Sequence, residues 1–547
     1  MEKIVSELKQ IIKAGFKEEV EPELSRPEPQ FGDYTTNIAL RLAKDSGREP
    51  HEIAAEIAKQ IGELPEVVSA EVAGPGFINI RLSDAALLAM ARPLETGDLE
   101  STTVVIETNN PNPFKAMHIG HAFNAILADT LANLLEAKGD YVHRVSYHGD
   151  VGLHVGKSMY AILRYIDNQP ERLDEIPGAE RNAFMSRMYA EGARAYKEDD
   201  AAKAEIEELT KRSFTRDEVV FAAVYDTVSA WSFEQIDAVV ARLGNKPVER
   251  RFLESDAELR GVKVVKDNVP GVFQESDGAF IFKGSEYGSF DNAFVSSRGT
   301  GLYGARDLGL IQLKNEYYHP AKSYIVTAEE QRDYFKGVLA AAKLCFRETK
   351  GETINIPTGT VKLSSGKMSS REGDVVEIAW LFDQIGEAVK ARGGEPIDAV
   401  VAGALRYAFL RVRIGGDVVF DVNEAVSLQG NSGPYLQYAH ARACSILEKA
   451  GASQSSLESQ AFDDNERTLL RKIGEGSEVV NRAVEEMLPH YVCNYLYELA
   501  QEFNRFYEKC RIIGDERQAI RLELVKLYRD QLSSGLGLLG IEALTRL

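Results

Sequence analysis

The chain opens with apolar residues at the spacing of amphipathic helices and then changes to strand patterns. Helical spacing of apolar positions occurs three times in the first stretch, at residues 4–12, 35–44 and 50–61. Residues 67–82 predict a hairpin, because two apolar runs flank the turn formers Gly74-Pro75-Gly76. The first hundred residues therefore predict a compact α+β domain.

From residue 103 onward, the pattern is that of a parallel α/β sheet. Val104–Ile106 is a short apolar β run, a polar loop follows at 107–115, and a long helix is predicted from near Gly120. A second strand is predicted over residues 141–150. In such sheets, ligands bind beyond the carboxyl ends of the strands, so we expect the polar loop to face a ligand.

The remaining patterns divide the chain into further segments. Residues 160–245 are mostly helical and charged, β patterns return at 279–282 and 324–326, and from about residue 423 nearly all periodicity is helical. The predicted fold is multidomain α/β, in five segments: 1–100, an N-terminal α+β domain; 101–160 with 246–380, a Rossmann-like parallel-sheet domain; 161–245, a mostly helical insertion; 381–426, a connecting region; and 427–547, a C-terminal all-α helical bundle.

Composition narrows the class of protein. Of the 547 residues, 44% are hydrophobic and 27% charged, a balance that excludes disorder for the bulk of the chain. No apolar run is long enough to span a membrane, and the first residues do not resemble a signal peptide, so we expect a cytoplasmic protein. The four cysteines lack CxxC spacing, and we expect neither a disulfide framework nor zinc.

Histidines cluster at the predicted start of the long helix. Five of nine lie between His118 and His154, and the densest group is His118-Ile119-Gly120-His121. Three interpretations are open: a metal site with Asp150, ordinary polar groups at a helix start, or a phosphate site. The last is consistent with the free backbone N–H groups and dipole of a helix N-terminus, where Gly120 allows close approach of a nucleotide.

A second polar cluster runs from Ser364 to Gly373 and reads SSGKMSSREG. Taken alone, such Ser/Gly/Lys runs are usually exposed linkers, and the P-loop pattern is absent. Together with a histidine phosphate site, however, Lys367 on a loop of this kind could stabilise charge on a pyrophosphate leaving group.

The pair of motifs resembles the HIGH and KMSS motifs of class I aminoacyl-tRNA synthetases. Further stretches are similar to the arginyl-tRNA synthetase family, in order along nearly the whole chain. They are Phe31–Tyr34, Gly74–Asn79, Pro111-Asn112, Tyr303–Asp307, Glu329–Gln331, Gly430–Arg442 and Leu538–Glu542. The resemblance implies an arginine–tRNA ligase, in which ATP activates L-arginine and the arginyl group passes to the 2′-OH of the terminal adenosine of tRNA(Arg).

The resemblance also implies roles for individual residues. Catalytic residues are His118, His121 and Lys367; the ATP site adds Lys115, Gly120, Ser369 and Ser370; and the arginine site is Glu107, Asn112, Tyr303, Asp307 and Gln331. A guanidinium has five donors and no acceptor, so its pocket needs carboxylates such as Asp307. Purely structural roles are the alternatives for four of these residues: an Asp307–Arg306 ion pair, core packing of Tyr303, and loop closure by Glu107 and Asn112.

The family implies three partners, which are L-arginine, ATP with Mg²⁺, and tRNA(Arg); we also expect a monomer. Its N-terminal domain contacts the tRNA elbow, and its C-terminal helical domain reads the anticodon. The net charge of −20 does not exclude a local basic surface, and residues 505–529 hold seven basic against four acidic residues. Candidate tRNA contacts are Tyr435, Gln437, Arg442, Arg505, Arg511 and Arg521. A solvated helix face and a packed helix junction are the alternatives.

Some positions depart from the family. HIGH is followed by Ala122-Phe123-Asn124, where many members have Leu-Arg-Ser, and Gly149–His154 differs from the usual Gly-Asp-Trp-Gly-Thr-Gln. Other hypotheses are a synthetase for another amino acid, an inactive RNA-binding relative and a small-molecule adenylyltransferase. A test of which amino acid is transferred to tRNA separates them.

Overall fold

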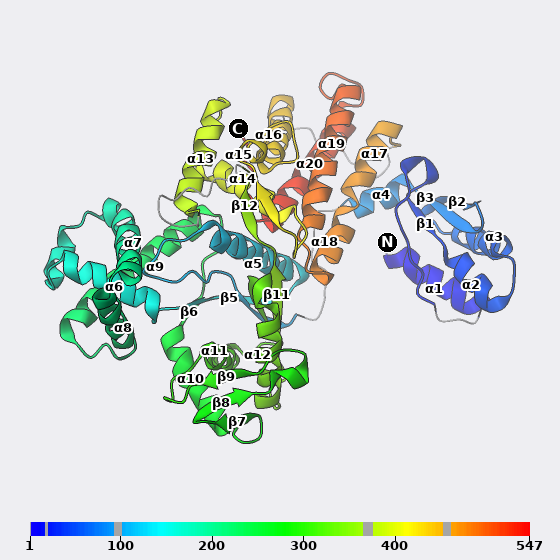
Figure 1. Ribbon diagram of the computed structural model, residues 1–547. Coiled ribbons are helices and arrows are strands. Elements are labelled where there is room, and N and C mark those ends of the chain that lie inside the picture. Colours follow the sequence, from blue (N-terminus) through cyan, green and yellow to red (C-terminus); the bar gives the residue numbers. More distant parts are fainter. Residues whose placement is uncertain (1, 17–19, 92–100, 365–375, 452–460) are drawn as a thin grey trace.

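The computed structural model describes residues 2–16, 20–91, 101–364, 376–451 and 461–547. At its centre lies a five-stranded sheet, in which all four pairings are parallel and the order is β11-β10-β4-β5-β6 (Figure 1). Its strands are β4 (Thr103–Glu107), β5 (Tyr141–His148), β6 (Arg250–Leu253), β10 (Lys322–Ala328) and β11 (Glu352–Thr358). The predicted Rossmann-like sheet is confirmed.

Helix α5 (Ile119–Lys138) follows β4 and is buried along most of its length. It packs on the sheet and also contacts α14, α18 and α20 of the C-terminal part. Apolar residues of α5 therefore belong to one continuous core with the sheet and the C-terminal helices. The helix that begins at HIGH is the central support of the molecule.

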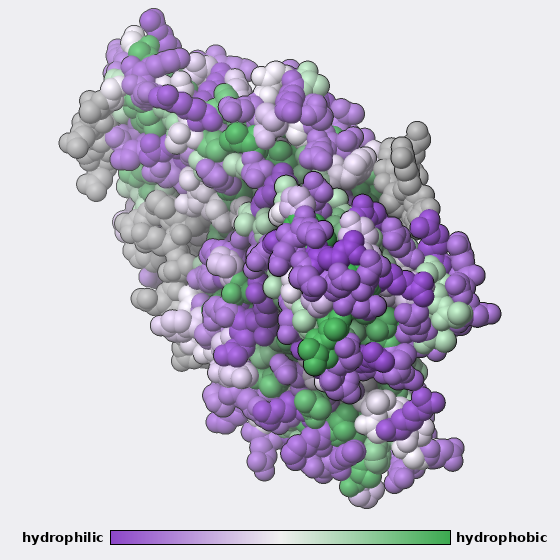
Figure 2. Space-filling model, turned by 90° about the vertical axis from the view of Figure 1, so that its left-hand side faces the viewer, coloured by the Kyte–Doolittle hydropathy of each residue, from purple (hydrophilic) through white to green (hydrophobic). Residues whose placement is uncertain are grey.

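The helical segment between β5 and β6 projects to one side of the sheet (Figure 1). Its helices are α6 (Leu153–Tyr165), α7 (Arg181–Glu198), α8 (Asp200–Thr215) and α9 (Val219–Arg242), with 3₁₀ turns at Pro170–Glu175 and Gly178–Glu180. They enclose a separate hydrophobic core. Residues of α6 belong to that core from Val155 onward. The boundary predicted between residues 160 and 161 therefore falls inside the core of the insertion. Figure 2 shows this side of the molecule as mainly hydrophilic, with small separate hydrophobic patches.

A smaller α+β unit lies between β6 and β11. It has a three-stranded antiparallel sheet in the order β7-β8-β9, and α11 and α12 pack on each other. Its elements are α10 (Glu254–Asp267), β7 (Phe273–Ser276), β8 (Ala279–Phe282), β9 (Asn292–Val295), α11 (Tyr303–Tyr318) and α12 (Arg332–Cys345), with 3₁₀ turns at Gly284–Tyr287 and Glu329–Gln331.

The C-terminal part is helical, as predicted. A connecting region holds β12 (Val361–Leu363), α13 (Ile378–Ala391), α14 (Asp398–Leu410), β13 (Val418–Phe420) and α15 (Val422–Ala425). The bundle comprises α16 (Gly433–Ala450), α17 (Asp464–Ile473), α18 (Gly476–Glu485), α19 (His490–Lys509) and α20 (Gln518–Leu538).

The N-terminal domain matches its predicted class, with one local difference. Its elements are α1 (Glu2–Phe16), a 3₁₀ turn at Pro29–Phe31, β1 (Tyr34–Thr36), α2 (Ile38–Ser46), α3 (Pro50–Ile61), β2 (Val67–Ala73), β3 (Phe77–Leu82) and α4 (Asp84–Met90). The predicted hairpin is confirmed, but the helix predicted from residue 35 begins at Ile38. Thr35 and Thr36 instead pair with β3, because β-branched residues suit a strand.

The N-terminal domain docks on the helical bundle through ion pairs. Arg26 binds Glu478 with two donors at 2.7 and 2.9 Å, and the Arg467 guanidinium lies 2.6 Å from the Asp33 carboxylate. All four residues sit in partly or fully buried positions. The N-terminal domain therefore lies beside α17 and α18 of the bundle, on the right of Figure 1.

Candidate active site

The strand order identifies where a ligand binds. Strand β4 lies between β5 and β10. The chain continues from β4 to β5 and β6 toward one edge of the sheet, and from β10 to β11 toward the opposite edge. The point at which the strand order reverses, where such sheets bind ligands, therefore lies between β4 and β10. Glu107 ends β4, and Gln331 ends the 3₁₀ turn directly after β10. Both predicted arginine-site residues therefore lie at the carboxyl edge of the sheet.

His118 and His121 form a reciprocal cap at the start of α5. The His121 N–H donates to His118 Nδ1 at 3.3 Å, the His118 N–H donates to His121 Nδ1 at 3.4 Å, and the rings stack at 3.5 Å. A Cβ at Gly120 would lie 3.2 Å from the His118 ring, so glycine leaves room for it. Because each Nδ1 accepts a hydrogen bond, the proton of each neutral ring is on Nε2, which remains a donor for a ligand.

Burial keeps both imidazoles uncharged at neutral pH. It lowers the pKa of His118 to about 4, with a further contribution from nearby Lys115. The pKa of His121 is lowered well below its usual value, first by burial and then by His118 and Lys115. Burial also lowers the pKa of Lys115. The helix start therefore offers two neutral N–H donors beside one ammonium, a set suited to phosphate oxygens.

Glu107 is held in a buried polar network. Lys314 Nζ donates to its Oε1 at 2.7 Å, and Asn110 Nδ2 donates to its Oε2 at 2.7 Å. Glu107 and Lys314 are both almost completely buried. Asn112 closes the adjacent loop, because its Oδ1 accepts a hydrogen bond from the Gly149 N–H at 3.0 Å. Loop closure thus accounts for one contact of Asn112.

Asp307 lies on the second turn of α11 and is partly exposed. Tyr334, on the first turn of α12, donates its hydroxyl to Asp307 Oδ2. The neighbouring Arg306 pairs instead with Glu254 and with Glu258, the latter at 3.1 Å. Among the described residues Asp307 forms no ion pair, so the Asp307–Arg306 interpretation does not hold.

The surroundings of Asp307 raise its pKa to about 7. Burial is the largest cause; the Tyr334 hydrogen bond lowers the pKa, Glu107 and Glu254 raise it, and Lys314 lowers it. A carboxyl group with this pKa gains strongly from a cation that arrives with the substrate. The interaction of Asp307 with Glu107 also indicates that α11 and the end of β4 face one region.

Tyr303 and Gln331 lie at the exposed margin of this region. Tyr303 begins α11, one turn before Asp307, and is 74% exposed. Its ring lies 5.6 Å from the Arg306 guanidinium. Core packing is therefore excluded for Tyr303, and both side chains are accessible to a ligand.

A cavity of ≈ 60 Å³ lies between the predicted arginine site and the predicted ATP site. Glu107 and His121 both line it, together with Asn109 and Asn124. The side-chain oxygens of Asn109 and Thr108 are buried there and have no hydrogen-bond partner. Buried polar atoms without partners are rare, and at a cavity wall they indicate where ligand donors bind.

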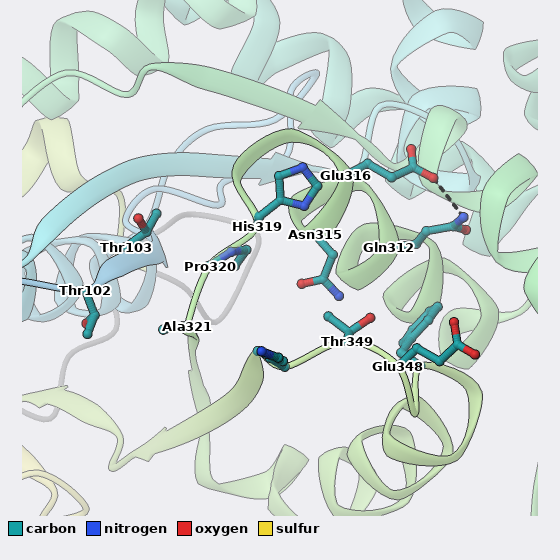
Figure 3. A pocket seen from close by; sticks show the side chains of 13 residues that line it. Thr102, Thr103, Gln312, Asn315, Glu316, His319, Pro320, Ala321, Glu348 and Thr349 are labelled. Carbon is teal, nitrogen blue, oxygen red and sulfur yellow. Dashed lines mark hydrogen bonds between the residues drawn. The ribbon is translucent and has the colours of Figure 1, made fainter.

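A larger cavity of ≈ 760 Å³ lies at the opposite edge of the sheet (Figure 3). Thr103 at the start of β4 lines it, as do His319 and Pro320 between α11 and β10. It opens at the amino ends of the strands, away from the switch point. The larger cavity is therefore not the candidate active site.

Several functional contacts were absent from the sequence prediction. Tyr334, Lys314, Asn109 and Asn110 all contact the predicted site residues or line the cavity between them. Lys314 carried a signal, because it lies seven residues after Asp307 and thus on the same face of one helix. Tyr334 follows Gln331 by three residues, but only the packing of α11 on α12 brings it to Asp307.

Lys367, Ser369 and Ser370 lie outside the described residues, so their predicted ATP contacts stay a prediction. The last described residue before them, Ser364, donates its hydroxyl to Asp421 at 2.7 Å.

The other three histidines of the cluster have local partners, and His143 lies 2.8 Å from the Glu249 carboxylate. His148 is buried between the Pro111 carbonyl at 2.6 Å and Ser146 at 2.8 Å, and His154 lies 2.8 Å from the Gly149 carbonyl. Asp150 is bonded to Arg216 and Ser255. Within the described parts of the chain, no three His, Cys, Asp or Glu side chains are grouped so as to hold a metal ion.

Two of the predicted tRNA contacts are occupied in packing. Gln437 is fully buried and donates its amide to the carbonyls of Ala399 and Glu542, each at 3.0 Å. Arg521 is 8% exposed and binds Glu466 at 3.0 Å. These contacts hold the bundle together and leave neither side chain available on the surface.

The other four predicted tRNA contacts lie at or near the surface of the bundle. The Arg442 guanidinium stacks 4.2 Å from the Tyr507 ring, and Tyr435 accepts a hydrogen bond from Asn504 at 2.9 Å. Arg505 is exposed and pairs with Glu502 at 3.0 Å, and Arg511 donates to the Ile513 carbonyl at 3.1 Å. Within 505–529, five basic side chains pair with carboxylates: Arg505, Arg517, Arg521, Lys526 and Arg529.

No described helix is both long and apolar enough to cross a membrane.

Comparison with known proteins matches three family descriptions along the chain. They are the arginyl-tRNA synthetase N-terminal domain at residues 2–82, the class I (R) tRNA synthetase catalytic domain at 85–393 and the DALR anticodon binding domain at 436–547. Curated relatives include arginine–tRNA ligases of Bacteroides thetaiotaomicron, 26% identical over 100% of this chain and 99% of that one, and of Vibrio vulnificus, 28% identical over 95% and 94%.

Solved structures show the same fold. Arginyl-tRNA synthetase of Thermus thermophilus is 24% identical with a TM-score of 0.82, and both chains are covered completely. That of Plasmodium falciparum is 20% identical with a TM-score of 0.80, over 100% of this chain and 99% of that one.

Proposed function

The chain belongs to the class I arginyl-tRNA synthetase family, and we propose which of its residues carry the reaction of that family. It is an arginine–tRNA ligase. ATP and L-arginine form arginyl-adenylate and pyrophosphate, and the arginyl group then passes to the 2′-OH of the terminal adenosine of tRNA(Arg). The substrate carboxylate is itself the nucleophile in the first step, so the protein must position substrates and stabilise charge.

Asp307 binds the guanidinium, and this assignment depends chiefly on one observation. Its carboxyl group accepts a hydrogen bond from a neutral donor, Tyr334, lies near enough to Glu107 at the end of β4 for that charge to raise its pKa, and forms no ion pair among the described residues. Arginine supplies that cation and a planar pair of donors that fits a carboxylate. Tyr303, one turn away and exposed, covers the ligand from the solvent side.

Glu107, Asn112 and Gln331 hold the amino and carboxylate groups of arginine. Glu107 supplies negative charge for the α-ammonium group at the end of β4. The unpartnered oxygen of Asn109, in the cavity between Glu107 and His121, is a further acceptor for that group. The amino acid would then extend from this cavity toward Asp307.

The ATP phosphates bind at the start of α5. His118 and His121 donate from Nε2, Gly120 allows close approach, and Lys115 adds positive charge. Lys367, Ser369 and Ser370 would contact the phosphates from the KMSS segment. Mg²⁺ would enter with ATP, because it takes most of its oxygen ligands from phosphates and water. It would neutralise phosphate charge during attack on the α-phosphorus.

The helical bundle contacts the anticodon and the N-terminal domain contacts the tRNA elbow. Arg442 with Tyr507 offers a cation and an aromatic surface together, which suits an unstacked base next to a phosphate. Arg505, Arg511 and Tyr435 are further candidates. We propose that the protein acts as a monomer in the cytoplasm, where its tRNA and ATP are found.

Transfer of labelled amino acids to tRNA tests the proposed activity. Purified protein is incubated with ATP, Mg²⁺, total tRNA and each of the labelled amino acids in turn. Arginine alone should become attached to tRNA. Attachment of another amino acid, or tRNA binding without any attachment, would overturn the assignment.

A further inference from the structure

The hydrogen bond between Tyr334 and Asp307 joins two helices at the proposed guanidinium site. Asp307 is the fifth residue of α11 and Tyr334 the third residue of α12. The Tyr334 ring packs on the core of this α+β unit and lies edge-on to Phe335, 5.2 Å between ring centres. The ring is therefore fixed by packing, and its hydroxyl reaches Asp307 Oδ2 from a set direction.

The charges around Asp307 make this donor important. Glu107 and Glu254 lie close enough to oppose ionisation of Asp307, whereas Lys314 is already engaged with Glu107 and Arg306 with Glu254 and Glu258. Tyr334 supplies a hydrogen bond that favours the carboxylate without adding a positive charge that would repel the guanidinium.

We propose that Tyr334 is a positioning residue for arginine: its hydroxyl holds Oδ2 of Asp307 so that the carboxylate faces the guanidinium. An ionised carboxylate has about four acceptor sites, so one bond from Tyr334 still leaves room for two parallel N–H bonds from the substrate. The inference rests on the proposed role of Asp307 and adds the residue that orients it.

A purely structural role would have different consequences. If the bond only joined α11 to α12, its loss would lower stability and leave the concentration dependence on arginine unchanged. If it orients Asp307, its loss weakens arginine binding and shifts the pH at which binding appears. Loss of a donor to an ionised group raises the pKa of Asp307, so arginine binding would require a higher pH.

The test is Y334F, which removes one oxygen and keeps the ring. In tRNA charging from pH 6 to 9, KM for arginine should rise about tenfold, and KM for ATP should stay unchanged as evidence of an intact fold. The acidic limb of kcat/KM for arginine should move to higher pH. The matched control is Y491F, which removes a hydroxyl–carboxylate hydrogen bond of 2.8 Å to Glu486 in the helical bundle and should alter none of these values.

An unchanged KM and pH profile for Y334F would overturn the proposal, whether or not its melting temperature falls. D307N separates this result from failure of the proposed site. If D307N loses arginine binding while Y334F retains it, Asp307 stands and Tyr334 is only structural. If D307N also binds arginine normally, the site itself is wrongly assigned.

Discussion

His118 caps α5 with one ring nitrogen and leaves the other for a ligand. The capping hydrogen bond to Nδ1 fixes the tautomer of His118, and burial keeps its ring neutral. The Nε2–H group therefore remains available as a donor to the ATP phosphates. Local signals of the sequence predicted a helix start at HIGH, but they left three interpretations of its histidines open, and the resemblance to the family selected the phosphate site. Tyr334 had no such signal, because its contact with Asp307 arises only from the packing of α11 on α12.

Substitution H118N separates capping from phosphate binding. Asparagine is among the preferred N-cap residues, so stability should change by less than about 0.5 kcal/mol. The ring N–H is lost, however, and adenylate formation should slow about 100-fold. Single-turnover rates and thermal unfolding measure the two effects. H118A, which also loses the cap, should be less stable by about 1 kcal/mol. A wild-type rate in H118N would remove the proposed role.

Arginine binding should depend on pH through Asp307. The pKa of this group in the empty protein is raised to about 7, and only the ionised form pairs with a guanidinium. Below pH 7, Asp307 must lose its proton before arginine binds, and this deprotonation opposes binding. The affinity for arginine should therefore fall about tenfold from pH 8 to pH 6. Both imidazoles are already neutral in this range. Calorimetric titration with arginine at several pH values measures this affinity. A constant affinity between pH 6 and pH 8 would contradict the assignment of Asp307 as the guanidinium ligand.

Helix α5 links the active site to the C-terminal bundle through buried charges. Arg406 of α14 is fully buried and binds Asp129 of α5 at 2.9 Å and the Leu539 carbonyl at 2.7 Å. A Cβ at Gly540 would lie 2.1 Å from the Arg406 guanidinium, which explains why glycine is needed there. Periodicity predicted the helices of the N-terminal domain at 4–12 and 50–61 and the start of α5, but it placed Thr35 in a helix, because pairing with β3 is not a local property.

Removal of Arg406 should destabilise the junction of α5 and α14. R406M leaves Asp129 buried with less compensation, and we expect a loss of about 3–5 kcal/mol in the free energy of unfolding. Urea unfolding followed by circular dichroism measures this loss. R242M removes an exposed ion pair with Asp398 and should cost less than about 1 kcal/mol. Equal losses of unfolding free energy in R406M and R242M would show that the buried Arg406–Asp129 pair stabilises the protein no more than the exposed pair does.

At the scale of the whole molecule, a net charge of −20 must coexist with tRNA binding. Residues 505–529 hold seven basic against four acidic residues, yet Arg517 and Arg521 share Glu466, and Tyr528 is buried against Phe503. Sequence counts cannot distinguish charges that face solvent from those that neutralise one another. The docking of the N-terminal domain on α17 and α18 was likewise not predictable, because it pairs residues more than 400 positions apart.

Two arginines of the bundle should respond differently to substitution. R442Q should weaken tRNA binding and reduce the slope of log K against log salt by about one. R521Q should lower the melting temperature, because it breaks buried contacts to Glu466, and leave that slope unchanged below the melting temperature. Filter binding at several salt concentrations, with a thermal melt, distinguishes them. A reduced slope in R521Q with no change in R442Q would reverse the assignment.

The most direct measurement is the arginine dependence of tRNA charging by D307N, compared with D383N, an exposed site on α13. Removal of one charge from the proposed pair should raise KM for arginine at least about 100-fold. KM for ATP should stay near wild type, and D383N should be unaffected. If D307N charges tRNA with a wild-type KM for arginine, the guanidinium is bound elsewhere and the account of this site is wrong.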